Sequence, residues 1–297
     1  MSTLWLVATP IGNLGDLAPR AVEVLSSVAL VCCEDTRRTG KLLQHAGIRA
    51  ERLAVCNEHT EFERIDDVLT VLASGRDVAV VSDAGTPGIS DPGERLVAAA
   101  IEAEHTVSAV PGPAAATMAV TISGFPSARY VYEGFLPRKG RDRAQRLAEV
   151  AREHRTIVLY EAPHRIERTL TDLTAACGPD RGVAVSRELT KLHEDTVRGT
   201  LGTLDIGEPR GEYAIVLAPV DDAPVDASDD AVRALVADTL AAGASTKDAA
   251  AQVSELTGRR RREVYQFAVE LGRALKREAT APDPAPTDTD VADTLTP

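Results

Sequence analysis

The apolar run Val78–Val81 stops at a loop, residues 82–93, that is dense in glycine, proline and aspartate. Apolar runs of this length are typical of buried strands. Glycine permits close backbone approach or a positive φ, and proline fixes φ and removes a hydrogen-bond donor. An ordinary connection between a strand and a helix needs only about 2–6 residues. The loop therefore indicates a rigid ligand-binding turn at a strand end, ahead of a helix predicted over residues 94–104.

The same construction occurs twice more. Apolar residues 4–8 precede the loop 9–16, and apolar residues 107–110 precede the loop 111–115. Three strand ends with Gly/Pro loops predict one shared binding cleft. None of the loops matches G-x-G-x-x-G, and G-x-x-x-x-G-K-[ST] is absent from the chain. These absences argue against a dinucleotide site of the Rossmann type and against a P-loop NTPase.

Strand-like and helical patterns alternate through the first part of the chain. This alternation predicts an α/β domain, residues 1–124, with a mostly parallel sheet covered on both faces. Its strands are expected at 4–8, 30–33, 53–56, 78–81 and 107–110. A second α/β domain, residues 125–219, has predicted strands at 156–160, 183–186 and 213–217 and helices at 143–153 and 166–177. Its later strands follow one another closely, which predicts a mixed sheet, and the cleft between the two domains is the expected ligand site.

The C-terminal part of the chain differs in composition. Residues 220–230 are predicted to form an acidic linker, and residues 279–297 a Pro/Asp/Thr-rich disordered tail. Between them, residues 231–278 show three helical patterns, over 231–242, 247–257 and 260–276. Ser245 with Asp248 resembles a helix cap, and Gly243 and Gly258 suit helix ends. We expect a helix-turn-helix-like RNA-binding module; a small helical cap that packs on the enzyme is the alternative.

The net charge of -12 over 297 residues is unusual for a protein that binds nucleic acid. Nine aspartates of the linker and tail account for most of it, so the rest of the chain is nearly neutral. Two basic clusters then stand out, at residues 138–143 and 259–262. Each is a candidate for phosphate contacts or a solvated surface.

Cysteine spacing and hydropathy argue against a metal-binding, disulfide-linked or membrane protein. The four cysteines form no C-x-x-C pair, which argues against a zinc site or a disulfide framework and predicts no bound metal. No secretory signal and no apolar run near 18 residues are present, so we expect a soluble, cytoplasmic protein without a membrane anchor.

Six ordered blocks of the chain together resemble the tetrapyrrole-methylase superfamily, in the branch that modifies ribosomal RNA. The blocks are Thr9–Leu14, Glu34–Thr39, Ser82–Gly93, Val110–Pro113, Tyr160–Arg165 and Arg187–Lys191. The resemblance implies S-adenosylmethionine as methyl donor. It implies the ribose 2′-hydroxyl of a cytidine in 16S rRNA, within the small ribosomal subunit, as acceptor. It also implies a homodimer.

Matching positions carry over as donor contacts. They are Ile11, Ala84, Gly85, Thr86, Ile89, Ala114, Ala115, Glu161 and Leu189. The chain departs from the tetrapyrrole-modifying branch at two places: Thr9–Gly12 replaces a G-x-G-P-G loop, and Gly85–Pro87 replaces Gly-Asp-Pro. Without that aspartate, the hydroxyl of Thr86 or the backbone is expected to contact the donor.

Transfer of a methyl group to a hydroxyl requires alignment of the reactants and removal of a proton. Asp35 and Lys191 are the leading catalytic candidates, ahead of Glu58, His59 and Asp83. Lys191 would act as a base only if burial lowered its pKa, and would otherwise hold a phosphate. The candidates for RNA contacts are Arg37, Arg38, His59, Arg138, Lys139, Arg259 and Arg260.

Two other functions remain open from the sequence. The nearest is C-methylation of a corrinoid or sirohaem precursor on the same fold; the missing Gly-Asp-Pro and the arginine-rich C-terminal helices count against it. The other is a nucleic-acid-binding regulator whose methylase core only senses the donor. Loops as elaborate as residues 82–93 would serve little purpose in such a regulator.

Overall fold

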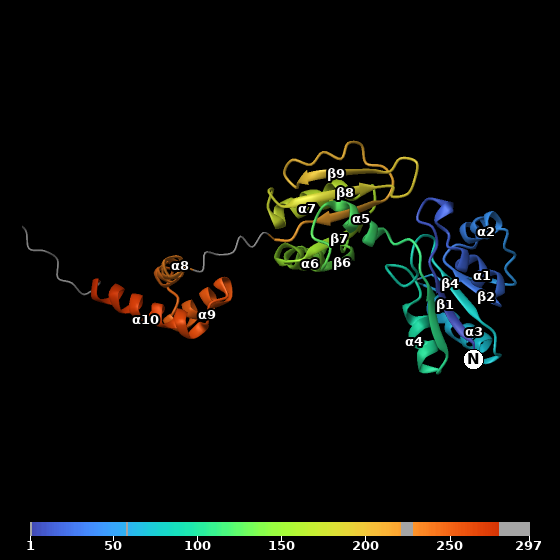
Figure 1. The fold of residues 1–297 in the computed structure, drawn as a ribbon, viewed down its shortest axis with the longest axis horizontal. Coiled ribbons are helices and arrows are strands. Elements are labelled where there is room, and N and C mark those ends of the chain that lie inside the picture. The colour runs from blue at the N-terminus through green and yellow to red at the C-terminus, as the bar shows by residue number, and fades with distance from the viewer. Residues whose placement is uncertain (1, 58, 221–227, 279–297) are drawn as a thin grey trace, which may run out of the picture. The chain divides into compact units, whose positions relative to one another are not determined.

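The structure is a computed structural model that describes residues 2–57, 59–220 and 228–278. The predictions for Glu58, for linker residues 221–227 and for the tail 279–297 lie outside the described residues. The chain divides into two compact units, residues 1–220 and 221–297, and Figure 1 labels their elements. Within the described residues, no helix is both long enough and apolar enough to cross a membrane.

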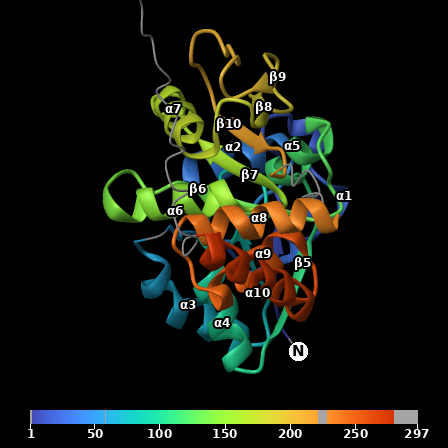
Figure 2. The ribbon, with the colours of Figure 1, turned by 90° about the vertical axis from the view of Figure 1, so that its left-hand side faces the viewer.

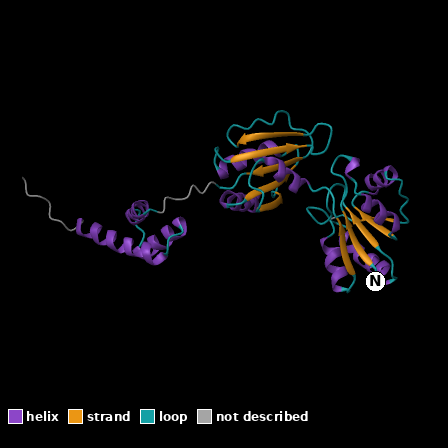
Figure 3. Ribbon diagram, viewed as in Figure 1, coloured by secondary structure: helices purple, strands orange, loops and turns teal. Residues whose placement is uncertain are grey.

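The first sheet, predicted to be mostly parallel, is entirely parallel, with strand order β3-β2-β4-β1-β5. Its strands are β1 (Thr3–Val7), β2 (Leu30–Cys33), β3 (Leu53–Val55), β4 (Val78–Val81) and β5 (Thr106–Val110). Alternate residues of each strand face opposite sides, so both faces carry apolar side chains. Helices α1 (Pro19–Ser27) and α2 (Thr36–His45) cover one face; α3 (Glu61–Ala73) and α4 (Glu94–Glu102) cover the other (Figure 3).

The order of this sheet decides where the three Gly/Pro loops lie. β1 stands between β4 and β5, so the loops that follow these three strands leave the sheet side by side at its carboxyl edge. The loop after β1 contains a short 3₁₀ helix, η1 (Leu14–Asp16). The strand order thus supports the prediction of one shared cleft.

The second sheet is mixed, as predicted, with order β6-β7-β10-β8-β9. Its strands are β6 (Tyr130–Phe135), β7 (Thr156–Glu161), β8 (Gly182–Arg187), β9 (Asp195–Thr200) and β10 (Tyr213–Leu217). Only β6 and β7 pair in parallel. The sequence analysis missed both edge strands, β6 and β9; the residues of β9 are half-buried or exposed and mostly polar. One face is covered by α6 (Gly140–Arg152) and α7 (Ile166–Cys177).

Helix α5 (Ala115–Ser123) covers the other face of the second sheet, although it directly follows β5 of the first sheet. Ala119 and Val120 pack against Ala184, Ala214 and Val216, which belong to β8 and β10. Small side chains on the helix allow this close approach. The chain therefore crosses from one sheet to the other at the loop that precedes α5.

The described part of the C-terminal unit, residues 228–278, is a bundle of three helices, α8 (Asp229–Ala241), α9 (Thr246–Thr257) and α10 (Arg261–Glu278) (Figures 1 and 2). Val236, Val253 and Val264 meet in its core. The predicted cap is confirmed, since the Ser245 hydroxyl accepts the Asp248 N–H at 3.2 Å. Gly258 ends α9 in the left-handed conformation, with φ +67°.

Candidate functional site

Backbone hydrogen bonds tie the three strand-end loops together. Thr9 and Gly85 exchange two bonds, with N···O distances of 2.8 and 3.1 Å. The Thr9 hydroxyl donates to the carbonyl of Ser82 at 3.1 Å, and the Ala8 N–H donates to the carbonyl of Val110 at 3.1 Å. The loops after β1, β4 and β5 thus form one connected surface.

Gly85 lies at the centre of this surface. Its φ is +84°, and a Cβ there would lie 3.3 Å from Ile11 Cγ2 and 3.7 Å from the carbonyl oxygen of Pro113. The backbone conformation therefore favours glycine, and a Cβ would also be in tight contact with Ile11. The Thr86 hydroxyl donates to the same Pro113 carbonyl at 3.3 Å, which joins the loop after β4 to the loop before α5.

Predicted donor residues from both sheets meet in one apolar cluster. Ile11 and Ala84 come from loops of the first sheet, Ala115 begins α5, and Leu189 follows β8 of the second sheet. Ile11 is 9 % exposed and Leu189 7 %. Ala114 caps α5 beside the cluster, whereas Ile89 is 48 % exposed. Small and apolar side chains beside glycine backbone suit a flat heterocycle with a polar tail, so these residues fit S-adenosylmethionine.

The loop after β8 is held in a strained conformation against the loop after β1. Glu188 and Thr190 have φ of +52° and +67°, which is uncommon for residues other than glycine. The Asn13 N–H donates to the Thr190 hydroxyl at 3.1 Å, and a Cβ at Gly12 would overlap Lys191. Such strain persists only where the surroundings enforce it, and it is concentrated at functional sites.

Lys191 is the cation that fixes this loop. Its Nζ lies 2.8 Å from Glu188 Oε1 and 2.9 Å from Glu212 Oε2. Burial alone would lower the pKa of Lys191, but the hydrogen bonds to the two carboxylates outweigh it and leave the pKa raised. A base would need the opposite shift. The geometry therefore favours the phosphate-holding or loop-ordering role over proton removal.

Asp35 caps helix α2. Its carboxylate accepts the Arg37 N–H at 2.8 Å and pairs with the Arg37 guanidinium at 2.7 Å. These hydrogen bonds hold the pKa of Asp35 well below its usual range, so it is a weak proton acceptor. Arg38 pairs with Asp83 at 3.3 Å. His59 is exposed, and its backbone N–H donates a hydrogen bond to Asn57 Oδ1 at 3.1 Å.

Asp91, in the loop after β4, is a titratable group that the sequence analysis did not single out. Burial and the nearby carboxylate of Glu34 raise the pKa of Asp91 to about 7. The preceding residue, Ser90, has φ +61° and shares a hydrogen bond with the Tyr132 hydroxyl of the second sheet. The sequence shows only one more aspartate in a polar loop, because the burial that shifts its pKa comes from tertiary packing.

Glu161 lies on the opposite face of the second sheet from α5. Both of its carboxylate oxygens are engaged: Oε2 accepts from the Thr169 hydroxyl at 2.6 Å, and Oε1 accepts from the Ala162 N–H at 2.9 Å and lies 3.1 Å from Arg165 Nε. The residue is 2 % exposed. A donor contact for Glu161 stays a prediction, and its hydrogen bonds connect it to a cavity that contains arginine.

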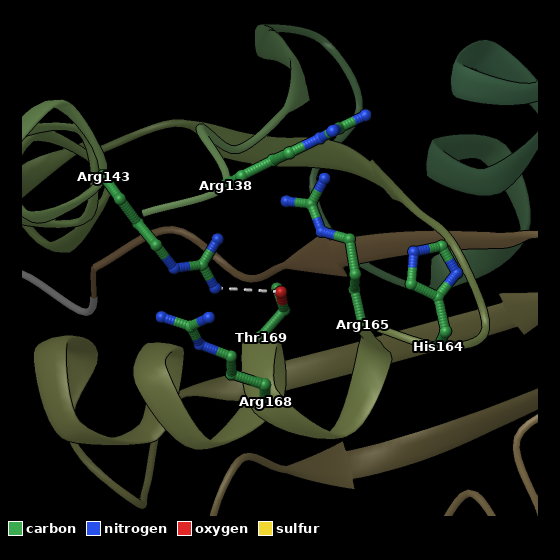
Figure 4. Close-up of a pocket in the computed structure, with 6 residues that line it drawn as sticks. All are labelled: Arg138, Arg143, His164, Arg165, Arg168 and Thr169. Atoms are coloured by element: carbon green, nitrogen blue, oxygen red, sulfur yellow. Dashed lines mark hydrogen bonds between the residues drawn. The ribbon is translucent and has the colours of Figure 1, made fainter. Parts of the chain in front are cut away.

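That cavity, of about 350 Å³, is drawn in Figure 4. Its lining residues are Arg138, Arg143, His164, Arg165, Arg168 and Thr169. Lys139 follows Arg138 and is exposed at the start of α6. In the C-terminal unit Arg260 is exposed, whereas Arg259 pairs with Asp229 at 2.9 Å and Glu263 at 3.2 Å.

Both the methylase part and the C-terminal helical part of the chain match known protein families. Residues 3–205 match the family Tetrapyrrole (Corrin/Porphyrin) Methylases, and residues 226–272 match the RsmI C-terminal HTH domain. Among solved structures, the methyltransferase CobJ is similar with a TM-score of 0.58 and 18 % identity, over 74 % of this chain and 95 % of that one. Uroporphyrin-III C-methyltransferase from Thermus thermophilus, complexed with S-adenosylhomocysteine, gives 0.51 and 16 % over 73 % and 97 %. These two likenesses establish the fold.

Two relatives are similar over nearly their whole length. The ribosomal RNA small subunit methyltransferase I of Synechocystis is 47 % identical over 91 % of this chain and 99 % of its own. The protein of the same name from Escherichia coli O157:H7 is 41 % identical over 90 % and 94 %. The expected methyltransferase class is confirmed. The chain belongs to the tetrapyrrole (corrin/porphyrin) methylase family, in the branch that contains the small-subunit ribosomal RNA methyltransferases I.

Proposed function

We propose that the protein transfers a methyl group from S-adenosylmethionine to the ribose 2′-hydroxyl of a cytidine in 16S rRNA. One observation supports the site above all: donor residues expected from loops far apart in the chain meet in a single cluster of Ile11, Ala84, Ala115 and Leu189. The two sheets each contribute to it. The RNA acceptor is supported by the relatives' shared name and by the match of the C-terminal helices to a helix-turn-helix domain.

Methyl transfer requires a bound donor, a fixed orientation of the reactants and an acceptor for the hydroxyl proton. The bound donor supplies an electrophilic methyl group on a sulfonium sulfur. The fixed loops around Gly85 orient the donor, and orientation is the main contribution that a protein makes to an in-line displacement. The hydroxyl proton needs an acceptor whose pKa lies near the working pH. Asp91, with a pKa of about 7, meets that requirement better than Asp35 or Lys191.

We further propose that the substrate is the assembled small ribosomal subunit, that the enzyme works as a homodimer, and that it acts in the cytoplasm, where ribosomes are assembled. The two sheets form the methylase core, in the domains 1–124 and 125–219, although α5 of the first domain packs on the sheet of the second. Residues 231–278 form the RNA-binding module. Arg37, Arg38, Arg259 and Arg260 remain candidates for phosphate contacts.

The test is methyl transfer from labelled donor to three acceptors: small ribosomal subunits, free 16S RNA and a tetrapyrrole precursor. We expect label in the 16S RNA of small ribosomal subunits but not in free 16S RNA or in the tetrapyrrole, and 2′-O-methylcytidine after nuclease digestion. Label in the tetrapyrrole would support the C-methylase alternative instead. Donor binding without transfer to any of the three would support the sensing regulator.

A further inference from the structure

The arginine-containing cavity beside α7 lies on the face of the second sheet that α5 does not cover. It is formed where β6 and β7 end: Arg138 follows β6, His164 and Arg165 follow β7, and Arg168 belongs to α7. Figure 4 shows the side chains of Arg143, Arg165 and Arg168 pointing into one region, whereas the side chain of Arg138 runs outward from its edge. The donor cluster does not share any of these residues.

The floor of the cavity is rigid. The Arg143 side chain, 5 % exposed, donates to Asp172 at 2.7 Å, to the carbonyl of Pro137 at 2.9 Å and to the Thr169 hydroxyl at 3.0 Å. Arg165 is fixed between Glu161 and the carbonyl of Leu136, the latter at 2.6 Å. A buried arginine such as Arg143, held by three hydrogen bonds, contributes fixed positive potential beneath the opening.

The rim of the cavity, Arg138 and Arg168, differs from the floor because the N–H groups of these two arginines lack close partners among the described residues. Arg138 makes no hydrogen bond or ion pair to any described residue. Arg168 is 64 % exposed and has a single long contact, 3.8 Å from Asp172. Two carboxylates, Glu161 and Asp172, face four guanidinium groups, so the cavity carries an excess of about two positive charges before His164 is counted.

The arginine side chains that line this cavity indicate a phosphate-containing ligand. Guanidinium groups present planar N–H pairs that match phosphate oxygens, and Arg is preferred wherever such pairing matters. Continuity with the exposed basic residues Lys139 and Arg141 favours a polymer with repeated phosphates over a small molecule. We propose that the cavity holds a backbone phosphodiester of the RNA substrate and thereby positions the strand; this inference rests on the proposed function.

The test uses the full chain with Arg138→Gln, Arg168→Gln and the double variant. Arg152→Gln is the matched control, because it removes another exposed arginine, from the part of α6 that lies outside the cavity. These are rim positions, so folding is preserved, which a substitution of buried Arg143 would not ensure. RNA affinity is measured as a function of salt, together with kcat and KM for RNA and donor affinity by calorimetry.

Each rim variant is expected to raise KM for RNA severalfold with kcat and donor affinity unchanged. Each phosphate that is no longer bound should lower the slope of log affinity against log salt by about 0.7. Arg152→Gln should match the wild type. Slopes and KM values equal to the control would overturn the proposal while the wild type still methylated RNA, whereas an inactive wild type would instead overturn the proposed function. Inorganic phosphate and a nucleotide are titrated in parallel. If the rim variants no longer bound these compounds but kept normal RNA affinity, the cavity would be assigned to a small phosphate compound. That result would also overturn the proposal.

Discussion

The hydroxyl of Tyr160 accepts a hydrogen bond at 2.8 Å from the backbone N–H of Ala116. Tyr160 belongs to β7, and Ala116 lies in the first turn of α5, where N–H groups lack partners within the helix. Tyr160 of the second sheet thus supplies a hydrogen-bond acceptor for an N–H group in the first turn of α5, the helix that follows the loop after β5. Tyr132 stacks edge-on against the same ring, with the centroids 5.2 Å apart.

Tyr160→Phe should therefore weaken donor binding more than it weakens folding. The lost hydroxyl leaves a half-buried N–H unpaired, at a cost of about 1–3 kcal/mol, and loosens the start of α5 beside Ala115. Calorimetric titration of the donor measures the effect. Tyr265→Phe, at an exposed tyrosine of α10 in the other compact unit, is the control. Equal donor affinity in both variants would contradict a role for this bond in the site.

Gly85→Val should abolish donor binding and leave the fold largely intact. The side chain would force a strained φ and crowd Ile11 where the backbone must face the ligand. Gly75→Val is the matched control, because Gly75 has φ +83° but no atom lies within 4 Å of the place that a Cβ would occupy. Circular dichroism checks folding. A folded Gly85→Val variant with normal donor affinity would remove the central site assignment.

Asp35→Asn and Lys191→Met should separate binding from proton transfer. Asparagine also caps helices, and Lys191 is held as a cation, so we expect single-turnover rates at saturating RNA to change little in the first variant. We expect the second variant to raise KM for RNA. A general base would instead lose roughly 10²–10⁴-fold in rate at unchanged affinities. Such a loss in either variant would establish that residue as the base.

Asp91 should make stability and rate depend on pH near neutrality. Its folded-state pKa of about 7 exceeds the unfolded value, so the native state retains a proton that the unfolded chain releases. Between about pH 4 and 7, the contribution of Asp91 to stability therefore falls as pH rises, and Asp91→Asn should flatten that fall in urea denaturation. As base, Asp91 should give a rate that rises through pH 7 and is lost in Asp91→Asn. Identical pH profiles for both proteins would refute the shifted pKa.

Removal of residues 221–297 should spare donor binding, because the residues proposed to contact the donor lie in the first compact unit. RNA affinity should fall, and the slope of log affinity against log salt should decrease by about 0.7–0.9 for each phosphate that the truncated chain no longer binds. Filter binding of 16S RNA at several salt concentrations is the measurement. An unchanged slope would favour a helical cap that packs on the enzyme over an RNA-binding module.

The sequence predicts those parts of the structure that local pattern determines. Val78–Val81 and Tyr213–Leu217 are continuous apolar runs, so their strands are confirmed at the same residues. Asp195–Thr200 is polar and lies at a sheet edge, where pairing with β8 rather than burial makes the strand, so no pattern predicted it. The resemblance predicts donor contacts at Ile11 and Leu189, which the fold brings into one apolar cluster. The partners of Lys191, the burial of Asp91 and the arginine cavity depend on segments that only the fold brings together.

The central position of β10 affects how this protein is synthesised. β10 stands in the middle of the second sheet yet is the last of its strands to leave the ribosome. Helix α5, which packs on β10, is made roughly 90 residues earlier. At translation rates of about 5–20 residues per second, its apolar face stays without its partner for on the order of 5–20 s. The nascent chain thus exposes an unfinished core throughout that interval, which makes this stretch of translation the point at which chaperone binding or aggregation competes with folding.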